Sequence, residues 1–387
     1  MQKKIIVLAV ASALSMPALA LAGATVYGQA DVGYVMTDNG GQTTGAGAGT
    51  GNTAAKRNQV ASNVSRLGFK GSEDLGNGMT GVWQMEGEVD MDTGTTRLFD
   101  SNTFLGVAGD FGTVVLGQHD TPYKMSTRGM DVFEDSIADN RSIMGVGGVM
   151  DYRGSDVLAY ITPDFSGFSA AVAMIGETDS QKLYNDIQPV VDSLLSPSAL
   201  TGTATKMSAT SLSANYGMDN WKAVLGYITV SVKESALPIN LDMTGTKVGG
   251  SYAMDAFAVN AVYEMLELKE SVSGGKMEQN NIYISGTYNV SDAGKVKLGY
   301  TMAGESKGSG GTTNTGSGAT QVSLGYDHAM SKNTTVYALY TGIANDTNAS
   351  YYLSNVGSTA GTAAAPAGLV PVGSDPSAIA VGVRIKF

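Results

Sequence analysis

Cysteine and histidine, two side chains that commonly serve as nucleophile and general base, are scarce in this 387-residue chain. The chain has no cysteine, and its two histidines are His119 and His328. Ser126 follows His119 closely, but a nucleophile of this kind needs a base that further groups hold in place, and the sequence offers no such set. We therefore expect both histidines to be ordinary residues near strand ends, and we expect no enzymatic activity.

The sequence also gives little evidence for a metal-binding or phosphate-binding site. The acidic segment DMDTG at 90–94 is too short for a calcium loop and lacks the Gly and Glu spacing of one. The Gly-rich runs at 45–52 and 308–318 follow no strand-to-helix pattern, so we expect external loops there rather than phosphate-binding turns. The sequence predicts neither a metal site nor a cofactor.

Charged side chains gather in the segment 120–152. This is the one long connection that is dense in charge, and it carries Asp131, Glu134, Asp135 and Asp139 together with Arg128 and Arg141. These are either ordinary solvated loop charges or part of a site that acts by electrostatics. Which of these two interpretations applies depends on the secondary-structure elements that flank the segment.

The sequence predicts that the flanking elements are β-strands. In SLSANYGMDNWKAVLGY at 211–227, Leu212 and Tyr216 alternate with polar residues before a tight turn, and Trp221 begins a similar return. A two-residue period is typical of a β-strand with one apolar face. The turns at one end are short, and the connections at the other end are long and polar: 37–63, 120–152, 178–205 and 344–377.

Short turns on one side, long loops on the other and aromatic residues near the strand ends are typical of a transmembrane β-barrel. In hydrocarbon every backbone N–H and C=O must pair within the protein, so the sheet has to close. We count about 16 strands and predict an all-β, antiparallel transmembrane barrel with periplasmic turns and extracellular loops. A barrel of that size encloses a water-filled channel, which fits the polar inward positions better than a soluble β-sandwich does.

The composition and the N-terminus agree with export. Hydrophobic residues make up 43% of the chain and charged residues only 15%, with a mean hydropathy of −0.00. Lys3 and Lys4 precede an apolar run and an A-x-A site at 20–22, which predicts a bacterial signal peptide over residues 1–22. Its removal takes the formal charge from −11 to −13, so nucleic acid is a poor candidate partner.

Several segments together resemble a known family, the Gram-negative general porins of the kind common in Neisseria and Burkholderia relatives. The segments are SRLGFKGSEDLGNGM with VWQMEGE, FLGVAGDFGTVVLGQ, LAYITPDFSGFSAAVAM and the terminal VGVRIKF. The resemblance implies that residues 23–387 form a 16-stranded trimeric outer-membrane porin for passive diffusion of ions and small hydrophilic solutes. It also implies that the third external loop, which we assign to 120–152, folds into the barrel as a constriction.

On this reading the acidic loop faces basic residues of the barrel wall across a narrow aqueous gap. The expected constriction residues are Asp131, Glu134, Asp135 and Asp139 on the loop, and Arg66, Lys70, Arg153 and Arg384 on the wall. The chain departs from the family at Gln118 and Ala159, where many members carry a basic residue. With an acidic total, this departure predicts weak cation selectivity.

The chain ends on Phe387 after strictly alternating residues. We expect this segment to be the closing strand, which pairs with the first strand and leaves no open edge. The resemblance implies that Phe387 is also the signal that the barrel-assembly machinery reads. Two other classes remain open: a substrate-specific channel, for which Tyr123 and Tyr152 are candidate aromatic contacts, and a surface receptor or adhesin that acts through the loops.

Overall fold

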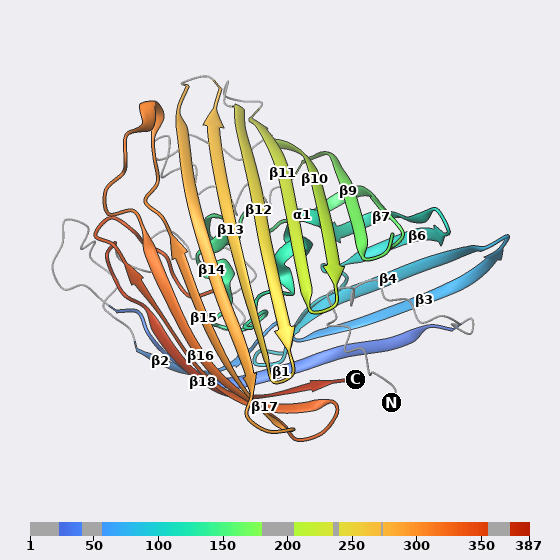
Figure 1. Cartoon of the computed structure of the whole chain (residues 1–387), viewed down its shortest axis with the longest axis horizontal. Helices are drawn as coiled ribbons and strands as arrows, with labels where there is room; N and C mark the ends of the chain where they lie inside the picture. Colours follow the sequence, from blue (N-terminus) through green and yellow to red (C-terminus); the bar gives the residue numbers. More distant parts are fainter. Residues whose placement is uncertain (1–22, 41–55, 180–204, 235–239, 272–273, 355–371) are drawn as a thin grey trace.

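Antiparallel strands form almost all of the regular structure (Figure 1). The computed structural model describes residues 23–40, 56–179, 205–234, 240–271, 274–354 and 372–387. The expected signal peptide, 1–22, lies outside these residues. The strands are β1 (Thr25–Asp38), β2 (Arg57–Ser62), β3 (Arg66–Gly76), β4 (Met79–Asp90), β5 (Thr95–Arg97), β6 (Thr103–Gly109), β7 (Gly112–Asp120), β8 (Arg153–Ile161), β9 (Phe168–Asp179), β10 (Thr205–Met218), β11 (Trp221–Glu234), β12 (Asn240–Met254), β13 (Phe257–Glu270), β14 (Lys276–Asn289), β15 (Gly294–Ala303), β16 (Ala319–Ala329), β17 (Thr334–Asn345) and β18 (Ser377–Lys386).

These 18 segments make a barrel of 16 strands within the described part of the chain. β2 pairs with one half of β1 and β3 with the other, so the two are one strand that is broken at residues 63–65. Val64 there has a φ of 47°, a conformation that interrupts the pleat. In the same way β5 and β6 both pair with β4. The predicted fold is confirmed.

The barrel closes where the first strand meets the last. β1 pairs with β18 in antiparallel register, with Val32 opposite Val383. The pairing continues past β18, because the Gly28 N–H donates to the Phe387 carbonyl oxygen at 2.9 Å and the Phe387 N–H donates back at 3.1 Å. The closing strand therefore has a partner on each side, as the sequence predicts.

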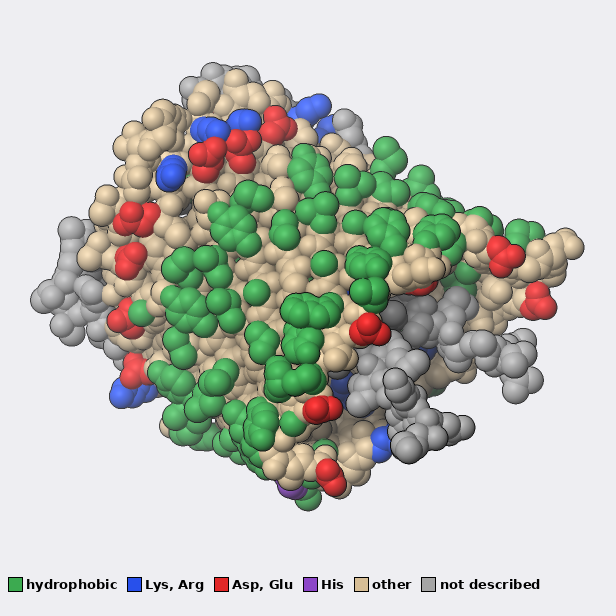
Figure 2. Space-filling model, viewed as in Figure 1, with side chains coloured by type: hydrophobic (Ala, Val, Ile, Leu, Met, Phe, Trp, Pro, Cys, Tyr) green, Lys and Arg blue, Asp and Glu red, His purple; other side chains and the backbone are tan. Residues whose placement is uncertain are grey.

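The outer surface of the barrel carries a broad band of hydrophobic side chains, with most charged groups nearer its margins (Figure 2). Along β13, Tyr263 and Met265 are exposed on the outside while Glu264 and Leu266 are buried on the inside. At the rim of the long loops, Lys276 forms ion pairs with Glu267 and Glu278. An apolar belt between charged rims matches the hydrocarbon layer of a membrane.

Helices are short in the described residues. They are α1 (Pro122–Arg128), α2 (Met144–Gly147), and the 3₁₀ turns η1 (Asn140–Ser142) and η2 (Ser309–Gly311). Thr121 caps α1 by accepting the Lys124 N–H at 3.3 Å, and Pro122 fits the first turn. Within the described ranges no helix has the length and apolar character needed to cross a membrane.

Candidate functional site

The long segment between β7 and β8, residues 121–152, lies inside the barrel. Figure 1 shows α1 behind β10, β11 and β12, and its residues contact all three strands. Tyr123, Met130 and Phe133 on this segment are at most 1% exposed, because they pack against the inner wall. We call residues 121–152 the inner loop.

Glycines on the wall make room for the inner loop. A Cβ on Gly245 would lie 2.8 Å from the Tyr123 hydroxyl oxygen, and one on Gly299 would lie 3.1 Å from the Phe133 ring. Real Cβ atoms do not tolerate the first distance and rarely the second, so larger side chains at these positions would push the loop into the lumen. The glycines facing the loop are Gly226, Gly245, Gly249, Gly299 and Gly325.

Polar side chains of β14 hold the middle of the inner loop. The Tyr283 hydroxyl donates to Asp131 Oδ1 at 2.7 Å, and the Ser285 hydroxyl donates to the Met130 carbonyl oxygen at 3.0 Å. Asp131 also accepts the Asn140 N–H at 2.9 Å. A buried carboxylate with this many donors fixes the loop to the wall and gives it a defined fold.

Arg128 is the centre of the charges on the loop. Its guanidinium contacts Glu134 at 2.8 Å, Asp135 at 2.8 Å and Asp139 at 2.6 Å. Arg141 adds a second contact to Asp139 at 3.1 Å. The loop therefore neutralises much of its own acidity, which the density of acidic residues in the sequence does not reveal.

The four predicted loop acids fall into two pairs with different surroundings. Asp131 and Asp139 are 5% and 0% exposed and are bonded within the loop or to the wall. Glu134 and Asp135 lie at the tip, and 42% of the Glu134 side chain is exposed. Asp135 is bound by Arg66 of β3 at 3.1 Å. The second pair is therefore the more accessible of the two.

The pKa values of the loop acids follow their surroundings. Burial, together with nearby Asp139, raises the pKa of Asp131 to about 6. Desolvation of the Glu134 carboxyl within the barrel and the negative charges of Asp135, Asp131 and Asp139 raise its pKa to about 7, against the opposing effect of Arg128. Burial opposes ionisation of Asp135 and Asp139 as well, but their arginine partners outweigh it and hold both pKa values below the usual range.

The basic group facing the tip consists of residues from β3 and β18. Arg66 contacts Asp135 directly, and Lys386 lies within electrostatic range of Arg66, Arg384 and the tip acids. Arg384 itself is bound to Asp31 on β1 at 2.6 Å. Lys386 is absent from our predicted constriction residues. It lies two positions after Arg384 and therefore on the same inward face of the strand, and this alternation in the sequence could have identified it.

The other two predicted wall residues have partners elsewhere. Lys70 lies over the Tyr27 ring, 4.9 Å from its centroid. Arg153 binds Asp120 at 2.9 Å, at the base of the inner loop. Of the four basic residues predicted to oppose the acidic loop, the structure brings Arg66 into direct contact with it.

The residues that depart from the family pattern are also engaged. The Gln118 amide donates to the carbonyl oxygens of Asp100 at 2.6 Å and Ser101 at 2.8 Å, so it holds the neighbouring external loop. Ala159 is 5% exposed and packs in the apolar cluster beside Val115. Neither position presents a charge to the lumen.

The groups weighed for catalysis have separate structural partners. The Ser126 hydroxyl donates to the Tyr123 carbonyl oxygen at 2.7 Å. His119 packs on Phe104, and its Nδ1 lies 2.8 Å from the Asp120 carbonyl oxygen. In the ranges that the structure describes, no group of three or more His, Cys, Asp or Glu side chains is arranged to hold a metal ion.

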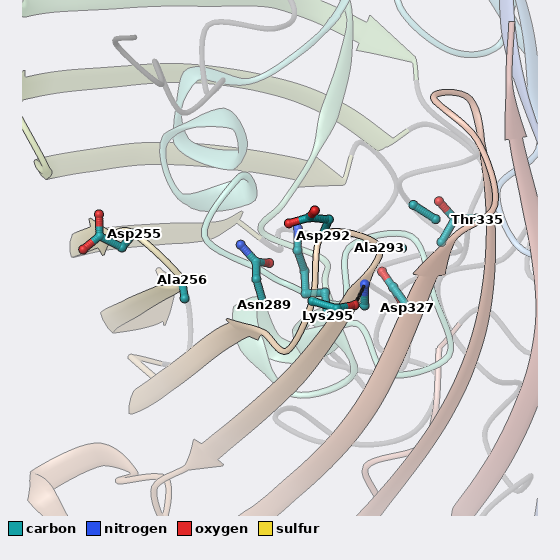
Figure 3. Close-up of a pocket in the computed structure, with 11 residues that line it drawn as sticks. Asp255, Ala256, Asn289, Asp292, Ala293, Lys295, Asp327 and Thr335 are labelled. Atoms are coloured by element: carbon teal, nitrogen blue, oxygen red, sulfur yellow. Dashed lines mark hydrogen bonds between the residues drawn. The ribbon is translucent and has the colours of Figure 1, made fainter. Parts of the chain in front are cut away.

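A polar cavity of about 670 Å³ lies at the short-turn end of the barrel (Figure 3). Asp255 lies in the turn between β12 and β13, and Asn289 ends β14. Asp292, Lys295 and Asp327 add further charged groups to the lining. These groups are arranged around the end of the strands, where the lumen opens. They make this end of the barrel polar.

Comparisons with known proteins agree with this architecture. A family model described as Gram-negative porin matches residues 7–369. The chain is 26% identical over 412 aligned positions to outer membrane porin protein 32 of Delftia acidovorans, covering 100% of both chains. It is 32% identical over 198 positions to the major outer membrane protein P.IA of Neisseria meningitidis, covering 48% of this chain and 49% of the relative.

Solved structures with the same fold include an anion-selective porin from Comamonas acidovorans. The two chains are 21% identical, with a TM-score of 0.72 over 95% of this chain and 100% of the other. The barrel, the polar lumen and the family match lead to one conclusion. The chain belongs to the Gram-negative porin family and forms a channel through the outer membrane for passive diffusion.

Proposed function

We propose that residues 120–152 are the constriction of this channel and that the tip of the inner loop controls which solutes pass. One observation carries the proposal: at the tip, Asp135 forms an ion pair with Arg66 of β3 at 3.1 Å inside a closed barrel, and the neighbouring Glu134 side chain is 42% exposed. Asp135 and Arg66 touch, so the transverse field comes from the more exposed charges, Glu134 on the loop and Lys386 on the wall. A field of this kind sorts solutes by sign and size.

The solutes are small and hydrophilic, without one preferred ligand. A substrate-specific channel needs a track of aromatic residues or a cluster of one charge sign in the lumen. Tyr123, one of the two aromatic candidates, is fully buried and bonded to the wall, and the tip carries charges of both signs. A general diffusion channel fits these features better than a specific one, or than a receptor that works through its external loops.

Weak cation selectivity remains our prediction, on the basis of the acidic total. The local balance at the constriction is narrow, because four loop carboxylates face the guanidinium groups of Arg128, Arg141 and Arg66. The related structure whose name calls it anion-selective is only 21% identical. The partly exposed Arg66 and the exposed Lys386 favour anions in this chain, whereas the overall charge favours cations.

We propose a homotrimer, because a related fold, OmpT of Vibrio cholerae, has been solved in a trimer form at a TM-score of 0.65 and 15% identity. We also propose that residues 1–22 are cleaved, that residues 23–387 form the barrel in contact with lipid, and that the barrel-assembly machinery reads Phe387.

Single-channel recording in planar lipid bilayers tests the function. A general porin gives a large open conductance that added sugars or organic acids change little. Block by one solute class would favour the specific channel, and purified, folded barrel without conductance would favour the receptor. Reversal potentials in a salt gradient then give the selectivity, and a clear anion preference would contradict the cation prediction.

A further inference from the structure

We infer that Glu264 of β13 is the positioning residue that holds both ends of the inner loop, and so sets the size of the opening. The inference rests on the proposal that this loop is the constriction. It concerns a buried wall residue that does not touch the tip and contributes no charge to the tip.

One carboxylate binds the loop near its start and near its end. Glu264 Oε1 accepts the Tyr123 hydroxyl at 2.6 Å, and Oε2 accepts the Gly145 N–H at 2.7 Å. Oε2 also accepts the Asn281 amide of β14 at 2.8 Å, which fixes the carboxylate on the wall side. Tyr123 and Gly145 are far apart in the loop, so this single side chain ties its two arms together.

Lys247 of β12 provides the compensating charge. Its ammonium group binds Asp151, in the last residues of the loop, lies 3.6 Å from Glu264 Oε1, and sits 4.3 Å from the centroid of the Tyr123 ring. Lys247 and Glu264 are 1% and 0% exposed. A buried charge pair of this kind persists only when its hydrogen bonds are complete, and here the loop supplies most of them.

The protonation states agree with this arrangement. Burial beside Glu264 and Asp151 raises the pKa of Tyr123 well above its usual range. The Tyr123 hydroxyl therefore keeps its proton and donates a hydrogen bond to the Glu264 carboxylate.

Removing the carboxylate should loosen both arms while the tip contacts remain. Glu264→Ala leaves Tyr123, Gly145 and Lys247 without their shared partner, so the loop gains freedom at its base. Glu264→Gln keeps a carbonyl oxygen for Gly145 and Asn281 and turns its amide toward the Tyr123 hydroxyl, which can accept. We expect Glu264→Ala to give larger open-channel current fluctuations and a larger conductance, and Glu264→Gln to restore most of the native behaviour.

The experiment records single channels from refolded barrels of Glu264→Ala, Glu264→Gln and Tyr123→Phe. Glu267→Gln is the matched control, since it changes an equal charge on the same strand at the rim, where its partners are Lys269 and Lys276. Heat-modifiable electrophoresis confirms that each barrel is folded. Tyr123→Phe should alter the currents in the direction of Glu264→Ala but less, and Glu267→Gln should leave them native.

Native conductance and native noise in folded Glu264→Ala would overturn the inference. If that variant does not fold, Tyr123→Phe decides, because Glu264→Gln is expected to be close to native. Native conductance and noise in folded Tyr123→Phe would then overturn the inference equally. Glu134→Gln tests the constriction proposal separately. If Glu134→Gln shifts the reversal potential while Glu264→Ala stays native, the loop is the constriction but Glu264 does not position it. If neither Glu134→Gln nor Glu264→Ala changes the channel, the constriction proposal itself is wrong.

Discussion

Asp31 Oδ2 and Arg384 Nε lie 2.6 Å apart across the seam where the first strand meets the last. The two residues are direct register partners in the β1–β18 pairing. Tyr337 of β17 and Asn63, at the break between β2 and β3, also donate to Asp31 Oδ1, at 2.8 and 3.3 Å. A slip by one residue would turn Arg384 toward lipid, so this cluster fixes the register of closure.

Arg384→Gln should therefore weaken closure of the barrel. It leaves Asp31, which is 0% exposed, without its cationic partner, and breaking a buried pair in this way costs about 3–5 kcal/mol. We expect a lower temperature for the conversion of folded to unfolded barrel on heat-modifiable gels. Lys386→Gln, on the same strand and with the same change of charge, is the control and should melt near the native temperature. Equal melting of the two variants would show that the Asp31 pair does not secure the seam.

The seam also shows what could be predicted from the sequence. The alternation in β18 places Arg384 and Lys386 inside because a strand has a fixed two-residue period, and the closure with β1 follows from the need to leave no edge. The same two-residue period allowed about 16 strands to be counted in the sequence and predicts the apolar side chains on the outer surface of the barrel.

The burial of residues in the inner loop could not be predicted in this way, because the loop has no regular alternation of apolar and polar side chains. Asp131 and Glu134 are both acidic residues of one loop, yet one is buried under Tyr283 and the other is exposed at the tip. Only the three-dimensional path of the chain separates them. Glu264 was missed for a related reason: its inward parity is readable, but its partners in the loop lie more than a hundred residues away in the sequence.

The wall glycines predict a second effect on the channel. Gly245→Ala places a methyl group 2.8 Å from the Tyr123 hydroxyl oxygen, so the loop must shift away from the wall; overpacking of this kind costs about 1–3 kcal/mol. We expect a smaller conductance than native. Gly250→Ala on the same strand is the control, because its Cβ would meet its nearest neighbour at an ordinary 3.7 Å. A native conductance for Gly245→Ala would mean that the loop does not rest on this glycine.

Deletion of Phe387 separates assembly from conduction. The Phe387 backbone continues the pairing with Gly28 beyond β18, outside the contacts of the inner loop. We expect the truncated chain to reach the outer membrane in much smaller amounts, while the barrels that do assemble conduct normally. The measurement compares the folded fraction in isolated outer membranes with single-channel conductance. Phe387→Tyr, which keeps an aromatic ring, serves as the control, and normal assembly of the truncated chain would remove the signal role.

The pH dependence of selectivity tests the tip of the loop. Glu134 has a pKa raised to about 7 and is exposed to the lumen, whereas Asp131, with a pKa raised to about 6, is buried. Lowering the pH from about 8 to about 5 protonates Glu134 and removes one negative charge opposite Arg66 and Lys386. The reversal potential in a salt gradient should then move toward anion permeability as the pH falls.

Glu134→Gln removes the group that titrates and so isolates its effect. We expect this variant to show, at every pH, a selectivity close to that of the native channel at low pH, with a much flatter pH profile. Glu267→Gln changes an equal charge at the rim and should retain the native profile. If Glu134→Gln kept the full pH dependence, the titrating group would lie elsewhere in the lumen. Retained pH dependence would also mean that the exposed tip carboxylate does not control ion passage, because a charge at the narrowest part of the channel cannot be removed without changing the field there.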